Sequence, residues 1–499
     1  MEGEGEMTNT IVDTEYGQVK GKTIGEVSVW KGIPYAKAPV GHLRFRPPQP
    51  PDPWEGIYDA TLFGPVAIQP TKEIMSFLDN EHARMSEDCL NLNIWSPEAD
   101  EKRRPVMVWI HGGAFMNGSG SSGTYDGTSF AANGDVVVVT FNYRLGVMGF
   151  LHLDDINDEY ASSGNCGILD QVAALKWVKE NIDSFGGDPD RITVFGESAG
   201  AMSIGTLLAI PSARGLFNQA ILQSGAARNV LKSETAARVA KKVLGNLGMD
   251  SKYLSALEEI PADKILKAAE HIPPMALGPV IDGLVIPEHP EIAIAKGAAQ
   301  DIPVLVGTNK DEYRLFTFFD PTWNQVDEAG MVHRLKKMLG PLWQGIEPHV
   351  MNQRLDRNLF EKVMSFHIFT FPAVQLAEQQ VRYRSPVWMY RFDWESPVFD
   401  GGLKATHAME IPFVWNYINK PGMENLIGDY PDQNIAKQMH QAWIAFAHNG
   451  SPNTPLLPDW EQYNLDTRPM MLFNVESKVA NDQDKDERLI WEKASGLIK

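Results

Sequence analysis

The sequence predicts an α/β protein built on a large, mostly parallel central sheet that is flanked by helices. Short β-branched, apolar runs alternate with helical stretches along most of the 499 residues, which is typical of a parallel sheet. No repeat or low-complexity linker divides the chain, so one large unit is a better interpretation than several small ones. A glycine-flanked serine lies between a strand-like run and a helix-like run, and such sheets bind ligands where loops leave the strand ends.

Six apolar runs are short enough and rich enough in β-branched residues to be buried strands. They are Val106–Ile110, Val136–Asn142, Ile192–Phe195, Ala220–Gln223, Val304–Gly307 and Val387–Phe392. Between them, Leu169–Asn181 and Ala236–Leu247 have the spacing of amphipathic helices. Residues 64–86 carry few strand signals, and residues 315–385 are helix-rich with many aromatic side chains. We expect both stretches to be excursions from the sheet that roof a pocket.

The chain ends and the charge limit the cellular setting. The first residues are acidic and polar, and we expect a short disordered tail over 1–9 and a single domain over 10–497. The net charge of −19 argues against nucleic acid or an anionic membrane as a partner, and no apolar run approaches the roughly 18 residues of a membrane span. The two cysteines, Cys89 and Cys166, allow at most one disulfide, which a chain of this size does not need. We therefore predict two free thiols and a cytoplasmic monomer.

The segment Gly196-Glu-Ser-Ala-Gly200 follows the predicted strand at Ile192 and precedes small, apolar residues that suit a helix. Strand, sharp turn and helix are the context in which G-x-S-x-G presents a nucleophilic serine. Gly196 and Gly200 would avoid Cβ clashes in so tight a turn, and the helix N-terminus favours negative charge. The motif alone also occurs by chance, but its context favours Ser198 as the nucleophile.

A serine nucleophile needs donors for the oxyanion that forms during acyl transfer. The predicted strand ending at Ile110 runs into His111-Gly-Gly-Ala114, where small residues let N–H groups turn toward one point. A glycine-rich surface loop is the alternative interpretation. The position of the loop, after a strand and before the serine, favours the N–H groups of Gly113, Ala114 and Ala199 as donors.

The serine also needs a base and an acid that holds the base. Asp311 and Glu312 follow the predicted strand at Val304; an exposed charged turn is the alternative, and spacing does not choose between the two carboxylates. Six histidines come later in the chain, namely His333, His349, His367, His407, His440 and His448. His440 lies in an amphipathic helix pattern, whereas His407 lies in a glycine-containing loop after the strand at Val387. The loop position favours His407 as the base.

Several blocks of the sequence resemble the type-B carboxylesterase family of the α/β-hydrolase fold, which also includes the cholinesterases and neuroligins. They include WKGIPYAKAPVGHLRF (30–45), SEDCLNLNIW (86–95), WIHGGAF (109–115), NYRLGVMGF (142–150), FGGDPDRITVFGESAGAMS (185–203) and KDEYRLF (310–316). The resemblance covers nearly the whole chain and is closest to bacterial para-nitrobenzyl esterases. It implies an α/β-hydrolase fold with helical excursions that roof an active-site gorge.

The resemblance also implies roles for single residues. Ser198 matches the family's nucleophile, His407 its general base, and Glu312, rather than Asp311, its acid. The oxyanion-hole positions of the family fall on Gly113, Ala114 and Ala199, and Ser224 matches a buried serine that supports the site. Neither a metal nor an organic cofactor is implied, and the partner is a small-molecule ester.

Some positions depart from the family pattern or match a structural feature of it. Secreted members pair the cysteine of the EDCL block with one about twenty residues upstream, where this chain has Ala67, so Cys89 should be a free thiol. Arg44 and Glu87 match a structural ion pair.

The substrate pocket also departs from the cholinesterase pattern. Leu315 stands where cholinesterases have an aromatic residue, and Pro273 and Met275 stand where they narrow the acyl pocket with aromatic side chains. Methionine adapts to different shapes, which predicts tolerance of longer acyl chains. The small residues that begin at Gly112 imply room for bulky alcohol groups.

The expected function is that of a serine carboxylesterase. The enzyme would hydrolyse esters with short to medium acyl chains through an acyl-enzyme intermediate. Two alternatives remain from the sequence. One is a neuroligin-like binding protein without catalysis, against which the intact set of serine, acid and histidine argues. The other is an amidase or a hydrolase that detoxifies foreign compounds and cleaves esters incidentally.

Overall fold

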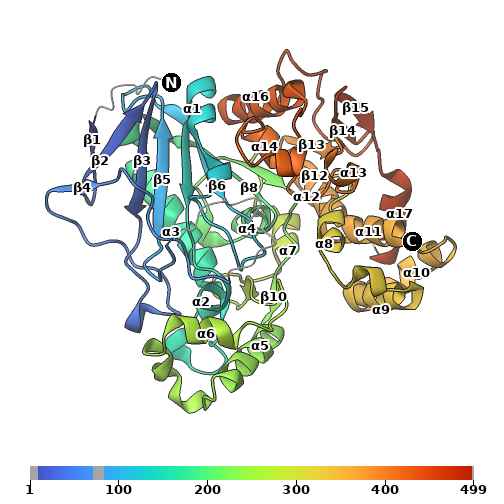
Figure 1. Cartoon of the computed structure of the whole chain (residues 1–499), viewed down its shortest axis with the longest axis horizontal. Helices are drawn as coiled ribbons and strands as arrows, with labels where there is room; N and C mark the ends of the chain where they lie inside the picture. Colours follow the sequence, from blue (N-terminus) through green and yellow to red (C-terminus); the bar gives the residue numbers. More distant parts are fainter. Residues whose placement is uncertain (1–8, 71–83, 497–499) are drawn as a thin grey trace.

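The computed structural model describes residues 9–70 and 84–496 (Figure 1). Residues 1–8 of the predicted tail, residues 71–83 of the irregular stretch and residues 497–499 lie outside the described residues. Asn9 belongs to the first strand and not to the predicted tail. In the described ranges, no helix combines the length and hydropathy that crossing a bilayer requires.

A 13-stranded sheet forms the centre of the described chain. Its strands lie in the order β1 (Asn9–Thr14), β2 (Gly17–Ile24), β3 (Val27–Pro34), β5 (Asn91–Ser96), β7 (Val137–Phe141), β6 (Arg104–Ile110), β8 (Gly187–Glu197), β9 (Gln219–Gln223), β12 (Val304–Asn309), β13 (Val387–Phe392), β14 (Pro469–Phe473) and β15 (Lys478–Asn481), with β4 (Ile57–Asp59) paired to β2. The strands from β7 to β14 are parallel, and antiparallel strands extend both ends of the sheet. All six predicted strands are present, which confirms the predicted fold class.

Side chains of the central strands alternate between two separate cores, because successive residues of a strand point to opposite faces. In β6, Val106, Val108 and Ile110 belong to one core, whereas Met107 and Trp109 belong to the other. The first core lies under α3 (Cys166–Asn181), α4 (Ala199–Leu207) and α12 (Phe371–Arg382). The second lies under α1 (Thr128–Gly134), α14 (Ile411–Val414) and α16 (Gln433–Asn449).

Further elements complete the body around the sheet. They are α2 (Gly146–Phe150), α5 (Ser233–Asn246), α6 (Ala262–Ala268), α7 (Pro290–Ala295), α13 (Val398–Gly401), α15 (Glu424–Ile427), α17 (Lys485–Ala494) and a small sheet of β10 (Leu231–Lys232) with β11 (Val280–Ile281). The predicted helix over 169–181 lies within α3, which exposes only a narrow stripe that includes Lys176 and Glu180. Asp170 and Gln171 are as inaccessible as its apolar residues.

The connection from β12 to β13 is a helical lobe. It contains α8 (Arg314–Phe318), α9 (Glu328–Leu339), α10 (Trp343–Met351), α11 (Arg357–Ser365) and a π-helical turn (Phe366–Thr370) that leads into α12. The lobe has a third apolar core of its own, to which Trp491 of α17 contributes. Figure 1 shows α9, α10 and α11 together at one side of the molecule, beside α17.

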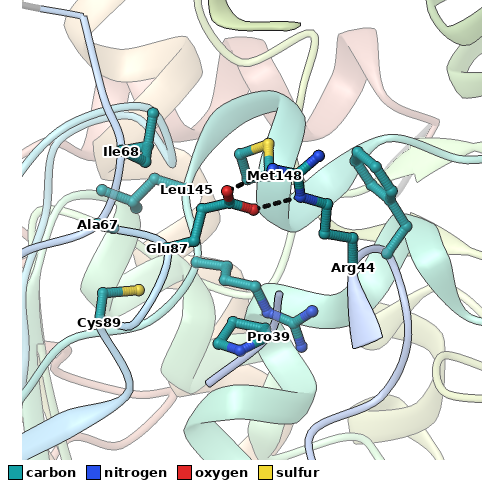
Figure 2. Close-up of a pocket in the computed structure, with 10 residues that line it drawn as sticks. Pro39, Arg44, Ala67, Ile68, Glu87, Cys89, Leu145 and Met148 are labelled. Carbon is teal, nitrogen blue, oxygen red and sulfur yellow. Dashed lines mark hydrogen bonds and ion pairs between the residues drawn. The ribbon is translucent and has the colours of Figure 1, made fainter. Parts of the chain in front are cut away.

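Both cysteines are buried and unpaired, as predicted. Cys89 and Ala67 line the same small pocket (Figure 2). Arg44 and Glu87, which the resemblance marked as an ion pair, form a bidentate pair across this pocket, with N···O distances of 2.6 and 2.5 Å. A second ion pair lies deeper: Arg144, in the loop after β7, donates to both carboxylate oxygens of Asp170 in α3, at 2.8 and 2.7 Å.

Replacing Asp170 by asparagine should leave the Arg144 guanidinium buried without a counter-charge, since both side chains are at most 4% exposed. We expect Asp170→Asn to lower the free energy of unfolding by about 3–5 kcal/mol. Asp190→Asn is the matched control, because Asp190 pairs with Lys179 at the surface with its side chain 72% exposed, and such pairs contribute about 0–1 kcal/mol. Urea denaturation of both variants tests this, and equal losses would contradict it.

Candidate active site

Ser198 occupies a strained turn between β8 and α4. Its φ of 54° and ψ of −122° lie where residues with a Cβ are rarely found, at a cost of roughly 1–3 kcal/mol. Its N–H donates to the carbonyl of Gln223 at the end of β9. A Cβ on Gly196 would lie 2.6 Å from the carbonyl oxygen of Ile110, and a Cβ on Gly200 would overlap the same oxygen. The turn therefore requires both glycines of the motif.

His407 and Glu312 meet beside this turn. Nδ1 of His407 lies 2.6 Å from Oε2 of Glu312, and Oε1 of Glu312 accepts the N–H of Asn309 at 2.8 Å. The Glu312 side chain is fully buried and that of His407 is 6% exposed. Asp311 points elsewhere, with a carboxylate oxygen 3.9 Å from Nζ of Lys404.

Glu197 is a member of this cluster that the sequence analysis missed. Its Oε1 lies 3.1 Å from Nε2 of His407, close enough for an ion pair although not aligned as a hydrogen bond. Among the described residues, no hydrogen bond joins the Ser198 hydroxyl to His407. The sequence signal that could have identified Glu197 is its position directly before the serine. The G-x-S-x-G motif allows any residue at that position.

The buried carboxylates shift the protonation of the cluster. Burial raises the pKa of Glu197 to about 8, with Glu410 and Glu312 adding to the effect and His407 opposing it. Burial alone would lower the pKa of His407, but the carboxylates of Glu197 and Glu312 outweigh it and raise that pKa to about 9. His407 is thus held as a stronger base than an ordinary histidine.

A second missed carboxylate, Glu410, ties together the segments that bear these groups. It accepts hydrogen bonds from Nε2 of Gln223 at 3.0 Å and Nδ2 of Asn309 at 2.7 Å. Asn309 also donates to the carbonyl of Thr406, the residue before His407. Burial, followed by Glu312, raises the pKa of Glu410. No local sequence pattern connects positions so far apart along the chain.

The loop after β6 lies directly against the serine turn. A Cβ on Gly112 would be 2.8 Å from Oε2 of Glu197 and 3.2 Å from Cβ of Ser198, and one on Gly113 would overlap the Asn117 carbonyl. Positive φ angles at Gly113 and Ala114 turn the backbone here, and within the described chain their N–H groups donate to no protein acceptor. Ala199 begins α4, so its N–H also has no partner inside the helix.

Aromatic rings, which the sequence analysis did not single out, lie beside His407. Leu315 is buried in α8 at 6% exposure, whereas its neighbour Phe316 is 45% exposed and lies 5.4 Å from the imidazole, between ring centroids. Phe369, from the π-helical turn, lies 4.8 Å from the same ring.

The two acyl-pocket candidates lie in the segment that precedes β11. Pro273 is exposed and Met275 is half-buried with a φ of 65°. The segment reaches the loop after β6 at Gly278, where a Cβ would be 3.3 Å from the ring of Phe115. Their role in substrate binding stays a prediction.

Comparison with known proteins gives the family of the chain. The sequence model of the carboxylesterase family matches residues 8–491. The chain is 44% identical to para-nitrobenzyl esterase of Bacillus subtilis (strain 168), over 97% of this chain and 98% of that one. It is 35% identical to phenmedipham hydrolase of Pseudarthrobacter oxydans, over 95% and 97% of the two chains. The crystal structure of a Geobacillus stearothermophilus carboxylesterase at pH 6.2 matches with a TM-score of 0.89 and 46% identity, over 97% of this chain and all of that one. The chain therefore belongs to the carboxylesterase family and is a carboxylic-ester hydrolase of the α/β-hydrolase fold.

Proposed function

We propose that the protein is a serine carboxylesterase in which Ser198, His407 and Glu312 act as a catalytic triad. The observation that supports this best is the 2.6 Å contact between His407 and a fully buried glutamate beside a serine in a strained strand-to-helix turn. Because β8, β9 and β12 are parallel neighbours, the serine turn and Glu312 emerge at one edge of the sheet. The same assembly argues against a binding protein that has lost its catalytic groups.

In the proposed reaction, Oγ of Ser198 attacks the ester carbonyl carbon while Nε2 of His407 removes the hydroxyl proton. Nε2 must turn from Glu197 toward the serine, and such contacts often tighten only when substrate is bound. The tetrahedral oxyanion would accept hydrogen bonds from the N–H groups of Gly113, Ala114 and Ala199. The alcohol leaves with the proton from His407, and water then attacks the acyl-enzyme by the same route.

The substrate we propose is a small, uncharged ester. The carboxylates of Glu197, Glu312 and Glu410 are buried around the base. Of the charged groups that shift the pKa of Glu197, His407 alone can carry a positive charge. An ester that carries its own negative charge would be repelled. The aromatic rings near His407 suit an apolar acyl or alcohol group, and the names of the relatives, which refer to para-nitrobenzyl esters and phenmedipham, support small organic substrates. Two buried, unpaired cysteines fit a reducing compartment, so we place the enzyme in the cytoplasm.

Ser198→Ala should abolish hydrolysis of p-nitrophenyl butyrate, because the nucleophile is lost. We expect kcat/KM to fall by about 10³-fold or more. Ser203→Ala is the matched control: Ser203 lies in α4, the helix that follows Ser198, and its hydroxyl accepts a hydrogen bond from Gln171. Assays at pH 8 measure kcat/KM of the two variants. A Ser198→Ala variant that keeps its activity would refute the triad.

The pH profile should report the raised pKa of His407. The base must be neutral to accept a proton, so kcat/KM should rise with pH toward the alkaline region, through a pKa of about 9. Glu197→Gln removes the strongest of the carboxylate effects that raise this pKa, and we expect the acid limb to move down by about one pH unit or more. Asp311→Asn is the control, since Asp311 faces Lys404, and identical profiles for the two variants would contradict the assignment.

The small residues Gly112, Gly113 and Ala114 predict room for a bulky alcohol group. We expect measurable hydrolysis of tert-butyl acetate. The assay measures the release of acetic acid, and ethyl acetate is the positive control. Turnover of the ethyl ester without turnover of the tert-butyl ester would show that the alcohol side is too narrow.

A further inference from the structure

His407 is held by few polar contacts for a residue that must aim one nitrogen at a serine. It lies in the irregular segment between α13 and α14, next to Ala408 with a φ of 65°. Within residues 9–70 and 84–496, its one hydrogen bond joins Nδ1 to Glu312, which fixes one end of the ring and leaves the tilt of its plane free. At the other end, Glu197 attracts Nε2. Something besides these carboxylates must set the plane of the imidazole.

Two phenyl rings supply that contact. The centroid of Phe369 lies 4.8 Å from that of His407 at an interplanar angle of 40°, and the centroid of Phe316 lies at 5.4 Å and 41°. The two phenyl rings are 6.4 Å apart and nearly parallel, at 8°. The imidazole therefore packs against a pair of aligned rings rather than against one chance neighbour.

The π-helical turn explains how Phe369 comes to face His407. An α-helix that continued unchanged from α11 into α12 would keep one row of side chains toward the core of the lobe. The π turn inserts an extra residue and rotates the following side chains relative to that row. As a result, Phe366 and Phe371 pack on Trp491 in the lobe, whereas Phe369 packs on His407. Single π turns of this kind occur frequently at functional sites.

We propose that Phe369 and Phe316 are positioning residues, which fix the plane of the His407 ring and stabilise it when it becomes positively charged during ester hydrolysis. This inference rests on the proposed triad. Both phenyl centroids lie within the roughly 6 Å over which an aromatic ring attracts a cation. The attraction is strong only after His407 has taken the serine proton, so it favours the transition state over the bound substrate.

The test compares leucine with phenylalanine at both positions, using p-nitrophenyl butyrate. Phe316→Leu and Phe369→Leu should each lower kcat by roughly 5-fold or more, with KM changed by less than about 2-fold. The acid limb of kcat/KM should also move to lower pH, because leucine lacks the ring face that adds to the stabilisation of the imidazolium by Glu197, Glu312 and Glu410. Phe316→Tyr keeps the ring, and its hydroxyl can reach solvent from this half-exposed position, so it should restore wild-type kcat.

Matched controls separate positioning from packing. Phe366 lies on the same π turn as Phe369, and Phe318 lies in the same helix as Phe316. In the described part of the chain, Phe366 packs on Trp491 and Phe318 on Phe319, and neither ring packs on His407. Phe366→Leu and Phe318→Leu are therefore the controls. We expect these controls to lower thermal stability without changing kcat or the acid limb. Unchanged kcat in both Phe316→Leu and Phe369→Leu, or an equal loss in the controls, would overturn the inference. An inert wild-type protein would instead overturn the proposed function and this inference with it. If the wild type is active and Ser198→Ala is inactive, the triad holds, and the phenylalanine variants then test the positioning role alone.

Discussion

The close approach of strand β6 to the turn after β8 is the constraint on which the site depends. The carbonyl of Ile110 fills the space that a side chain on Gly196 or Gly200 would need. The same contact brings Gly112, at the start of the next loop, against Ser198. Nucleophile and candidate oxyanion donors are therefore set by one backbone contact between neighbouring parallel strands, and not by the side chains that surround them.

The parallel sheet extends this arrangement to the other groups. Gln223, at the end of β9, accepts the N–H of Ser198 through its backbone and donates to Glu410 through its side chain. Asn309, at the end of β12, contacts both Glu312 and Glu410. Each strand end contributes one polar link, so the groups proposed as catalytic are positioned by adjacent strands although they are far apart along the chain.

Local sequence patterns predicted the six central strands and the turn at Ser198, because both depend on short-range periodicity and on glycine. The choice of His407 followed from its loop position, but the choice of Glu312 over Asp311 required a family resemblance, since only the fold decides which neighbouring carboxylate turns inward. The proposed role of Phe369 as a positioning residue could not be predicted from the sequence. The direction of its side chain depends on a π turn, which no residue pattern in 357–382 predicts. It also depends on the core of the lobe, which includes Trp491, more than one hundred positions away.

The environment of His407 has to satisfy two opposing needs. A carboxylate stabilises an imidazolium by contacting one of its nitrogens, which suits Nδ1 and Glu312 but places Glu197 at the nitrogen that must serve Ser198. A phenyl face attracts the same charge without occupying either nitrogen. Aromatic rings beside His407 thus provide stabilisation that further carboxylates could not add without blocking the reaction.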